Sequence, residues 1–297
     1  MDMRIYTNIS TQITILVVIF VGIVGYIMIE KEIDDKRMVG MCKESAIVIK
    51  DIRYADKKSL TLDLYIPDEP SALLVWIHGG GWTNGDKKDA NQIFKKFIKS
   101  GYAVAYINYS LTNIDSHPRQ IQEIKGAIRW LRANADNYGY NTSSIIVGGG
   151  SSGAHLALLL GLSGDVAELE GTVGGNLEYS SKVDAIVDFY GISDLSLFDI
   201  ESPSFNRLGN ISSRLLESAS PVYYLTSDDP PVIIFHGDKD VTVSISQSSH
   251  LNYLYNKMGL RSYFYPIEGA THGGDEFGSE KIINLIKEFL LEEIKNA

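Results

Sequence analysis

Hydrophobic residues along this chain fall into short apolar runs that alternate with amphipathic stretches. The run at 72–78 is apolar up to Ile77, which is typical of a strand buried on both faces. Two earlier runs, 46–54 and 60–66, predict an antiparallel pair. Further strands are expected at 102–108, 144–149, 183–190, 231–236 and 261–266, and helices at 89–100, 118–137, 153–162, 245–258 and 281–294. This alternation predicts one α/β domain at 44–297, with a mostly parallel, twisted sheet and helices on both faces.

The first thirty residues follow a different pattern. Residues 9–29 are uncharged and mostly apolar, and a helix of that length measures about 30 Å, which matches the core of a bilayer. We therefore predict a short tail at 1–8, a single transmembrane anchor at 9–29 and a charged linker at 30–43. A cleaved signal peptide, which would make the protein secreted, and a buried helix are the alternatives; no small-residue cleavage site precedes Glu30. The Lys/Arg count narrowly favours a cytoplasmic C-terminal side.

Composition narrows the possible functions. The 297 residues are 44% hydrophobic and 22% charged, as expected of a globular protein with a large core. The formal net charge is −10 and no basic cluster occurs, so we expect no nucleic-acid partner. A single cysteine, Cys42, excludes an intrachain disulfide. The six histidines show no metal-ligand spacing, and no dinucleotide fingerprint occurs, so we expect neither a metal nor a cofactor.

A G-x-S-x-G pattern follows the predicted strand at 144–149 and opens the helix at 153–162. It consists of Gly149, Ser151 and Gly153. Small residues two before and two after a serine allow the sharp strand-to-helix turn that exposes a nucleophilic hydroxyl. A structural glycine-rich turn is the alternative for the pattern, and Ser152 is the rival nucleophile. Only Ser151 stands between the two glycines, so we predict that it is the nucleophile.

A second glycine run, His78-Gly79-Gly80-Gly81-Trp82, begins at the last residue of the strand predicted at 72–78. Acyl transfer places negative charge on a carbonyl oxygen, which preorganised N–H donors stabilise. We expect the backbone N–H groups of Gly80, Gly81 and Ser152 to form this oxyanion hole. A flexible turn is the alternative, and His78 is predicted to be a structural hydrogen-bonding residue.

A nucleophilic serine requires a general base and an acid that orients it, and in this kind of sheet the chain order is serine, acid, histidine. Asp240 follows the strand at 231–236 and is the predicted acid, with Asp238 as the alternative. His272 lies in a glycine-rich loop after the last strand and is the predicted base. The other candidate base, His250, falls within a predicted helix. His117, His155 and His236 are interpreted as local structural residues.

These motifs together resemble the α/β-hydrolase superfamily of serine esterases. HGGGWTNGDK at 78–87 and GGSSGAHLALLLG at 149–161 resemble the compact esterases grouped near the feruloyl and acetyl-xylan esterases, and the hormone-sensitive-lipase-like esterases share the HGGG loop. The resemblance covers about residues 45–295. Two positions depart from it: Ser110 stands where relatives usually carry arginine, and Ser152 stands where alanine is commoner.

The resemblance implies a serine carboxylesterase that hydrolyses short acyl groups, such as acetyl or feruloyl, on a small-molecule or carbohydrate ester. It also implies that the catalytic domain lies outside the cytoplasm. Insertions at 163–182 and 191–229 are long enough for a modest lid. Four residues in the second are candidates for an acyl pocket, with core packing as the alternative: Ile192, Leu195, Leu197 and Phe198. An arylformamidase-like amidase and a catalytically inactive, membrane-tethered binding module are the rival functions.

Overall fold

The computed structural model describes residues 46–88, 92–111, 117–164, 166–197 and 213–295. Contacts between residues group Ala46–Ala297 into one unit. The predicted tail, the transmembrane anchor at 9–29 and the linker up to 43 lie outside the described residues, so the anchor stays a prediction. Among the helices that are described, none is both long and apolar enough to cross a bilayer.

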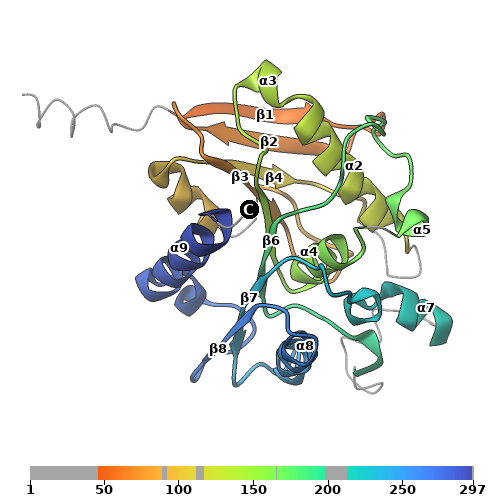
Figure 1. Ribbon diagram of the computed structural model, residues 1–297, viewed down its shortest axis with the longest axis vertical. Coiled ribbons are helices and arrows are strands. Elements are labelled where there is room, and N and C mark those ends of the chain that lie inside the picture. The colour runs from red at the N-terminus through yellow and green to blue at the C-terminus, as the bar shows by residue number, and fades with distance from the viewer. Residues whose placement is uncertain (1–45, 89–91, 112–116, 165, 198–212, 296–297) are drawn as a thin grey trace, which may run out of the picture. The chain divides into compact units, whose positions relative to one another are not determined.

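The described residues form an eight-stranded sheet in the order β1-β2-β4-β3-β5-β6-β7-β8 (Figure 1). Strand β2 pairs in antiparallel fashion with β1 and β4, and every other neighbouring pair is parallel. The predicted antiparallel opening pair and the mostly parallel sheet are therefore confirmed. The strands are β1 (Ile47–Arg53), β2 (Thr61–Ile66), β3 (Ala72–Ile77), β4 (Tyr102–Ile107), β5 (Ile145–Gly150), β6 (Ala185–Phe189), β7 (Val232–Gly237) and β8 (Ser262–Ile267).

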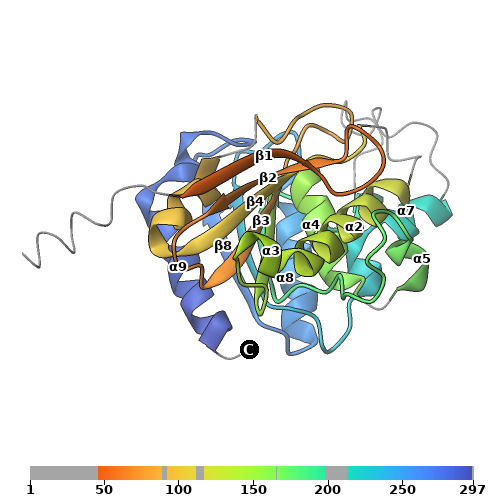
Figure 2. The ribbon, with the colours of Figure 1, turned by 90° about the horizontal axis from the view of Figure 1, so that it is seen from above.

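Helices cover both faces of this sheet (Figures 1 and 2). On one face lie α2 (Arg119–Ala133), α4 (Ser152–Leu162) and α8 (Ser246–Lys257), and on the other lie η1 (Gln92–Ser100) and α9 (Glu280–Lys295). Shorter helices occupy the connections: α3 (Ala135–Tyr138), α5 (Ala167–Glu170), η3 (Leu195–Leu197), α7 (Ser213–Ala219), η4 (Pro221–Tyr224) and η5 (Asp275–Gly278).

Each face of the sheet has its own apolar core, and strand β3 shows how the sequence divides between them. Leu73, Val75 and Ile77 pack into the core beneath α2, α4 and α8. Leu74 and Trp76 point the other way, into the core beneath η1 and α9. Because successive side chains of a strand alternate between faces, a strand covered on both sides must be apolar throughout. This confirms the interpretation of the run at 72–78.

The predicted helix at 118–137 is wrong in one respect, because it is two helices. The side-chain amide of Asn134 donates to the carbonyl oxygen of Trp130 (2.9 Å), and α2 ends at the preceding residue. A short side chain that bonds to the backbone competes with helix continuation. Helix α3 then runs to Tyr138 and ends at Gly139 in the left-handed conformation. The predicted helix at 89–100 is a 3₁₀ helix from Gln92 onward.

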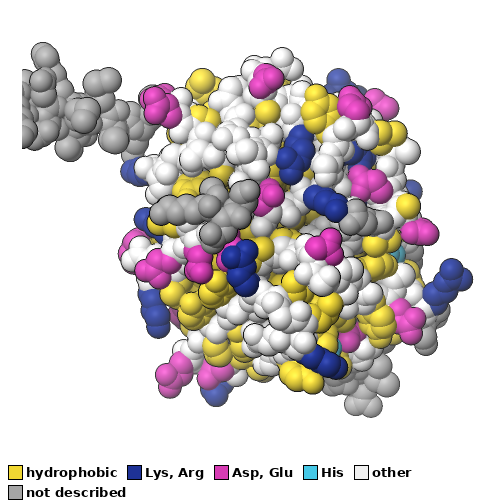
Figure 3. All heavy atoms as spheres, viewed as in Figure 1, with side chains coloured by type: hydrophobic (Ala, Val, Ile, Leu, Met, Phe, Trp, Pro, Cys, Tyr) yellow, Lys and Arg dark blue, Asp and Glu magenta, His cyan; other side chains and the backbone are white. Residues whose placement is uncertain are grey.

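The surface in Figure 3 carries basic and acidic side chains interspersed, with apolar side chains between them. Mixed charge of this kind is typical of a solvated protein surface.

The sheet register brings the ends of β3, β4 and β5 level, since Ile77 pairs with both Ile107 and Gly149. Loops that follow these parallel strands therefore leave from one edge of the sheet, which is where ligands bind in open α/β sheets.

Candidate active site

Ser151 stands on a sharp turn between β5 and α4. Its φ and ψ angles are 57° and −124°, an unfavourable conformation for a residue with a side chain. The neighbouring glycines make this turn possible. A Cβ on Gly149 would lie 2.5 Å from the backbone of Gly153, and a Cβ on Gly153 would lie 2.3 Å from the carbonyl oxygen of Ile77. The G-x-S-x-G spacing is therefore required by backbone packing around the serine.

The structure brings the three predicted catalytic residues together from loops after β5, β7 and β8. His272 Nε2 lies 2.9 Å from Ser151 Oγ, and His272 Nδ1 lies 2.7 Å from Asp240 Oδ2. An ionised carboxylate can only accept, so Nδ1 carries the proton and Nε2 accepts from the serine hydroxyl. The side chain of Asp240 is 0% exposed and that of His272 is 21% exposed. Ser151, His272 and Asp240 thus form a continuous hydrogen-bonded chain.

Asp240 is held in place by several donors. Its Oδ1 atom accepts from the N–H groups of Thr242 (2.8 Å) and Val243 (2.9 Å), and His236 Nε2 approaches Oδ2 at 3.3 Å. Burial alone would raise the pKa of Asp240, but the hydrogen bonds from His236, His272 and Val243 outweigh it and hold this pKa well below its usual range. Asp240 is therefore an anion that stabilises a positive charge on the imidazole.

Asp238, the alternative acid, does not contact the imidazole of His272. Its Oδ1 atom accepts from the N–H group of Gly269 (2.7 Å), which joins the loop after β7 to the loop after β8. This contact closes the turn that presents His272.

The glycine run after β3 packs directly against the nucleophile turn. A Cβ on Gly79 would lie 2.6 Å from the carbonyl oxygen of Gly150, and one on Gly80 would lie 2.2 Å from that of Asn84. Gly80 and Gly81 have φ angles of 122° and 59°, which favour glycine. Among the described residues, neither of their N–H groups donates to a backbone carbonyl. Both amides are thus available beside Ser151.

Histidines outside the triad have structural partners. His155 is fully buried between Trp82 Nε1 (3.2 Å) and the carbonyl oxygen of Ala219 (2.7 Å), and burial lowers its pKa to about 4. His236 accepts from the Ser248 hydroxyl (2.7 Å). Burial likewise lowers the pKa of His117 to about 4. These imidazoles brace the loops around the site.

His78 has the structural role that was predicted for it. Its ring stacks on Tyr109 with centroids 4.4 Å apart, and the Tyr109 hydroxyl donates to the His78 carbonyl oxygen (3.0 Å). His250 lies away from the triad, with Nε2 3.8 Å from Asp194 Oδ2. Among the described residues, no cluster of histidine, cysteine and carboxylate side chains is placed to hold a metal.

Tyr190 is a site residue that the sequence reasoning missed. It follows β6, and its ring packs against the rings of His272 and Phe277, with centroids 4.8 Å and 4.7 Å away. Burial, together with the charge of Asp240, raises the pKa of its hydroxyl to about 12. Tyr190 thus supports the face of the base. Its position at the carboxyl end of a predicted strand was the signal that could have identified it.

Lys87 anchors the far end of the glycine loop. Its Nζ atom lies 2.7 Å from Oδ1 of both Asp51 and Asp63, and its N–H group donates to Asn108 Oδ1 (2.6 Å). Asp51 sits at the irregular register between Ile49 and Ile52 with a φ of 57°, which turns its carboxylate toward the lysine. The loop that carries Gly80 and Gly81 is therefore tied to β1 and β2.

The residues suggested for an acyl pocket divide differently. Ile192 and Leu195 are 2% and 1% exposed and belong to the core beneath α4, so for them the core-packing alternative is correct. Leu197 is 44% exposed, and Phe198 lies outside the described residues.

Comparison with known proteins identifies the family of this chain. The BD-FAE family model matches residues 62–255, which is more than half of the chain. The chain belongs to the BD-FAE family. A relative in this comparison, Esterase LipC of Mycobacterium tuberculosis, is 27% identical over 242 residues, which cover 75% of this chain and 59% of LipC. Kynurenine formamidase of Drosophila melanogaster is 23% identical over 78% of this chain and 77% of that relative.

The fold is shared with solved structures. A truncated carbohydrate esterase from gut microbiota superposes with a TM-score of 0.76 at 28% identity, over 83% of this chain and 96% of that structure. The predicted α/β-hydrolase fold of this BD-FAE chain is thereby confirmed. Its aligned part spans 52–59% of the three mycobacterial esterases it matches first.

Proposed function

We propose that this protein is a serine carboxylesterase that hydrolyses short-chain acyl esters, with Ser151 as its nucleophile. The observation that carries the proposal is the unbroken contact series from Ser151 Oγ through His272 to buried Asp240. A serine at φ 57° on a strand-to-helix turn, with an imidazole nitrogen 2.9 Å from its hydroxyl, is the arrangement that acyl transfer requires.

Acylation follows from this geometry. His272 Nε2 removes the proton as Ser151 Oγ attacks the ester carbonyl carbon, and Asp240 stabilises the imidazolium that forms. The carbonyl oxygen becomes an oxyanion, which the N–H groups of Gly80, Gly81 and Ser152 stabilise. When the C–O bond to the alcohol breaks, His272 returns the proton to the leaving alkoxide. The products are an alcohol and an acyl-Ser151.

Deacylation repeats the same steps with water. His272 Nε2 takes a proton from a water molecule as its oxygen attacks the acyl carbon, and the second oxyanion occupies the same hole. Collapse breaks the bond to Ser151 Oγ, which regains its proton from His272. The acid is released and the site is restored.

The similar proteins and the short helices after β6 support the substrate class. The similar solved structure is described as a carbohydrate esterase, and LipC is described as an esterase. The described helices of the insertion after β6 are short: α7 has seven residues, while η3 and η4 have three and four. An insertion with only short helices among its described residues suits a small acyl group on a bulky alcohol, so we infer acetyl or feruloyl esters of carbohydrates.

The test is hydrolysis of p-nitrophenyl acetate, butyrate and octanoate by the full-length protein in detergent. Ser151→Ala should lower kcat at least about 10³-fold, while Ser249→Ala, an exposed serine of α8, serves as the matched control. A fluorophosphonate should add its mass to the peptide that contains Ser151 in the wild type. Equal rates in wild type and Ser151→Ala would overturn the proposal.

The formamidase alternative has one observation in its favour. The Drosophila relative is matched over 77% of its own length, which is more than the mycobacterial esterases. Acyl transfer from a formamide uses the same three residues, with an amine as the leaving group. Turnover of N-formylkynurenine faster than that of every ester tested would favour this function, and no turnover of either class would favour the inactive binding module.

We also propose that residues 9–29 anchor the protein in a membrane, with the catalytic domain outside the cytoplasm. The uncharged run of bilayer-spanning length supports the anchor, and a carbohydrate ester substrate supports the orientation. Protease treatment of intact cells should digest the catalytic domain. Full protection of the domain would contradict the orientation, and recovery in the soluble medium would favour a cleaved signal segment.

A further inference from the structure

A long cavity of about 1160 Å³ lies beside helix α2, apart from the triad. Three segments line it: the end of β1 with the loop to β2, one face of α2, and residues 172–176. We call this cavity the α2 groove. None of Ser151, His272 and Asp240 lines it, so it is distinct from the catalytic site.

The α2 face in the groove is regular. Arg119, Glu123, Trp130 and Asn134 follow one another at spacings of four, seven and four residues, which place side chains on one side of a helix. Over the fifteen residue steps from Arg119 to Asn134 a helix rises about 22 Å. The groove therefore has the length of an extended chain of several small units.

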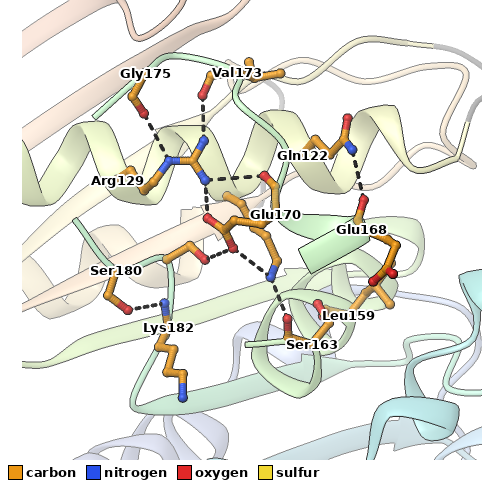
Figure 4. A network of polar contacts seen from close by, with 12 residues as sticks. Gln122, Arg129, Leu159, Ser163, Glu168, Glu170, Val173, Gly175, Ser180 and Lys182 are labelled. Carbon is orange, nitrogen blue, oxygen red and sulfur yellow. Dashed lines mark hydrogen bonds and ion pairs between the residues drawn. The ribbon is translucent and has the colours of Figure 1, made fainter. Parts of the chain in front are cut away.

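The opposite rim is built rigidly. Arg129 is 1% exposed, and its guanidinium donates to the carbonyl oxygens of Val173 (2.8 Å) and Gly175 (3.1 Å) (Figure 4). It also pairs with Glu170. Gly174 has a φ of 73° and lies so close to Tyr54 that a Cβ would meet its carbonyl oxygen at 2.7 Å. This rim is held in place before any ligand binds.

The lining contains three basic side chains, Arg53, Lys57 and Arg119, and two acidic ones, Asp56 and Glu123, and this small basic excess favours an acidic sugar. Arg53 and Arg119 are exposed, and their guanidinium groups make no hydrogen bond or ion pair with the described residues. Two arginines that line one cavity suit a carboxylate, because the planar guanidinium forms paired hydrogen bonds with it. Half-buried Trp130 offers an aromatic surface for the apolar face of a sugar ring. Asn134 and Thr172 add polar groups for hydroxyls.

The sheet register relates the groove to the triad. Arg53 pairs with Thr61 at the start of β2, and the next residue, Leu62, pairs with Ile107 at the end of β4. Ile107 is level with Ile77, which pairs with Gly149. Arg53 thus lies at the edge of the sheet that carries Ser151, four strands away. Neighbouring strands lie about 4.8 Å apart, so the separation along the sheet is about 19 Å.

We propose that the α2 groove binds the uronic-acid-bearing part of a carbohydrate chain whose ester group is presented to Ser151. Arg53 and Arg119 bind the uronate carboxylate, and Trp130 packs against a neighbouring sugar ring. This inference rests on the proposed esterase function for the ester group alone, because the groove binds the chain without hydrolysing it.

Binding is measured by calorimetry with the full-length protein in detergent. The probes are xylo-oligosaccharides that carry glucuronic acid and neutral xylo-oligosaccharides of equal length, all free of esters. The acidic probe should bind at least tenfold more tightly than the neutral one, and less tightly as salt rises. The double variant Arg53→Gln/Arg119→Gln should lose about tenfold in affinity, whereas Arg214→Gln, an exposed arginine of α7, should not. Equal binding of both probes, no binding, or no effect of the double variant would overturn the proposal.

A kinetic arm separates this proposal from the proposed function. The double variant should lower kcat/KM at least fivefold for an acetylated acidic oligosaccharide and leave kcat/KM for p-nitrophenyl acetate within twofold. Equal loss on both substrates would overturn the groove as a binding site. If the wild type hydrolysed neither ester, the esterase proposal would fail, while the calorimetry would still decide the groove. Trp130→Ala, with its Tm checked, should weaken binding of acidic and neutral probes alike.

Discussion

Replacing Lys87 by methionine removes a buried ammonium group and keeps a side chain of similar length. The Lys87 side chain is 1% exposed and contacts two carboxylates at 2.7 Å each. The Asp63 side chain is 5% exposed, whereas that of Asp51 is 64% exposed. In the variant, water can solvate Asp51, but Asp63 is left in the interior without its counter-ion.

The magnitude therefore follows from Asp63. Removing one partner of a buried ion pair destabilises a protein by about 3–5 kcal/mol. Asp63 Oδ1 keeps the hydrogen bond that it accepts from the N–H group of Asp51 (2.9 Å), so we expect the lower end, about 3 kcal/mol. In a domain of this size 1 kcal/mol shifts Tm by roughly 2–4 °C. Lys87→Met should lower Tm by about 6–12 °C.

Thermal unfolding followed by circular dichroism measures this shift, with exposed Lys88→Met as the control. A surface substitution should move Tm by no more than about 2 °C. The double variant Lys87→Met/Asp63→Leu should be more stable than Lys87→Met alone, because no unpaired carboxylate stays buried. A decrease in Tm for Lys87→Met no larger than that for Lys88→Met would refute the reasoning.

Three further substitutions test the site and its surroundings. In Gly80→Ala the new Cβ would lie 2.2 Å from the carbonyl oxygen of Asn84, so kcat for p-nitrophenyl acetate should fall about 10²–10³-fold with KM nearly unchanged. Asp240→Asn keeps the side-chain shape but no longer enforces the tautomer of the base, so kcat should fall about 10⁴-fold in the same assay. Burial raises the pKa of Asp188 to about 6, although nearby His236 acts to lower it. Because the pKa is higher in the folded than in the unfolded protein, the free energy of unfolding decreases as pH rises from about 4 to 6. Asp188→Asn should therefore gain about 3 kcal/mol relative to the wild type between pH 4 and 7 in urea unfolding, and a difference that does not change with pH would contradict this.

The sheet and the catalytic turn were predictable because their causes are local. A strand covered on both faces has to be apolar throughout, so the run at 72–78 predicted β3 to within one residue at its end. The turn at Ser151 needs small residues at Gly149 and Gly153, where any Cβ would meet backbone. Both causes leave a pattern within ten residues of sequence.

Contacts between distant segments leave no such pattern. Lys87 stands in the HGGGWTNGDK motif, but its partners Asp51 and Asp63 precede it by 36 and 24 positions and read as ordinary strand residues. Tyr190 packs on His272 only because the loop after β8 folds back over the end of β6. At the end of α2 the side chain of Asn134 bonds to the Trp130 carbonyl oxygen, a contact that the otherwise helical sequence pattern does not indicate.

The structure also accounts for Ser110, which departs from the arginine usual in related esterases. Buried Glu123 accepts from both the N–H group (2.7 Å) and the hydroxyl (2.5 Å) of Ser110. The Ser110 oxygen in turn accepts from Lys57 Nζ (2.6 Å), so a cation from the loop after β1 reaches the carboxylate through the serine. Gln120 Nε2 donates to the carbonyl oxygens of Ser110 (2.9 Å) and Trp82 (3.3 Å). The first turns of α2 are thus hydrogen-bonded to the glycine loop beside the nucleophile. The small hydroxyl of Ser110 lets the ammonium group of Lys57 compensate the buried carboxylate of Glu123.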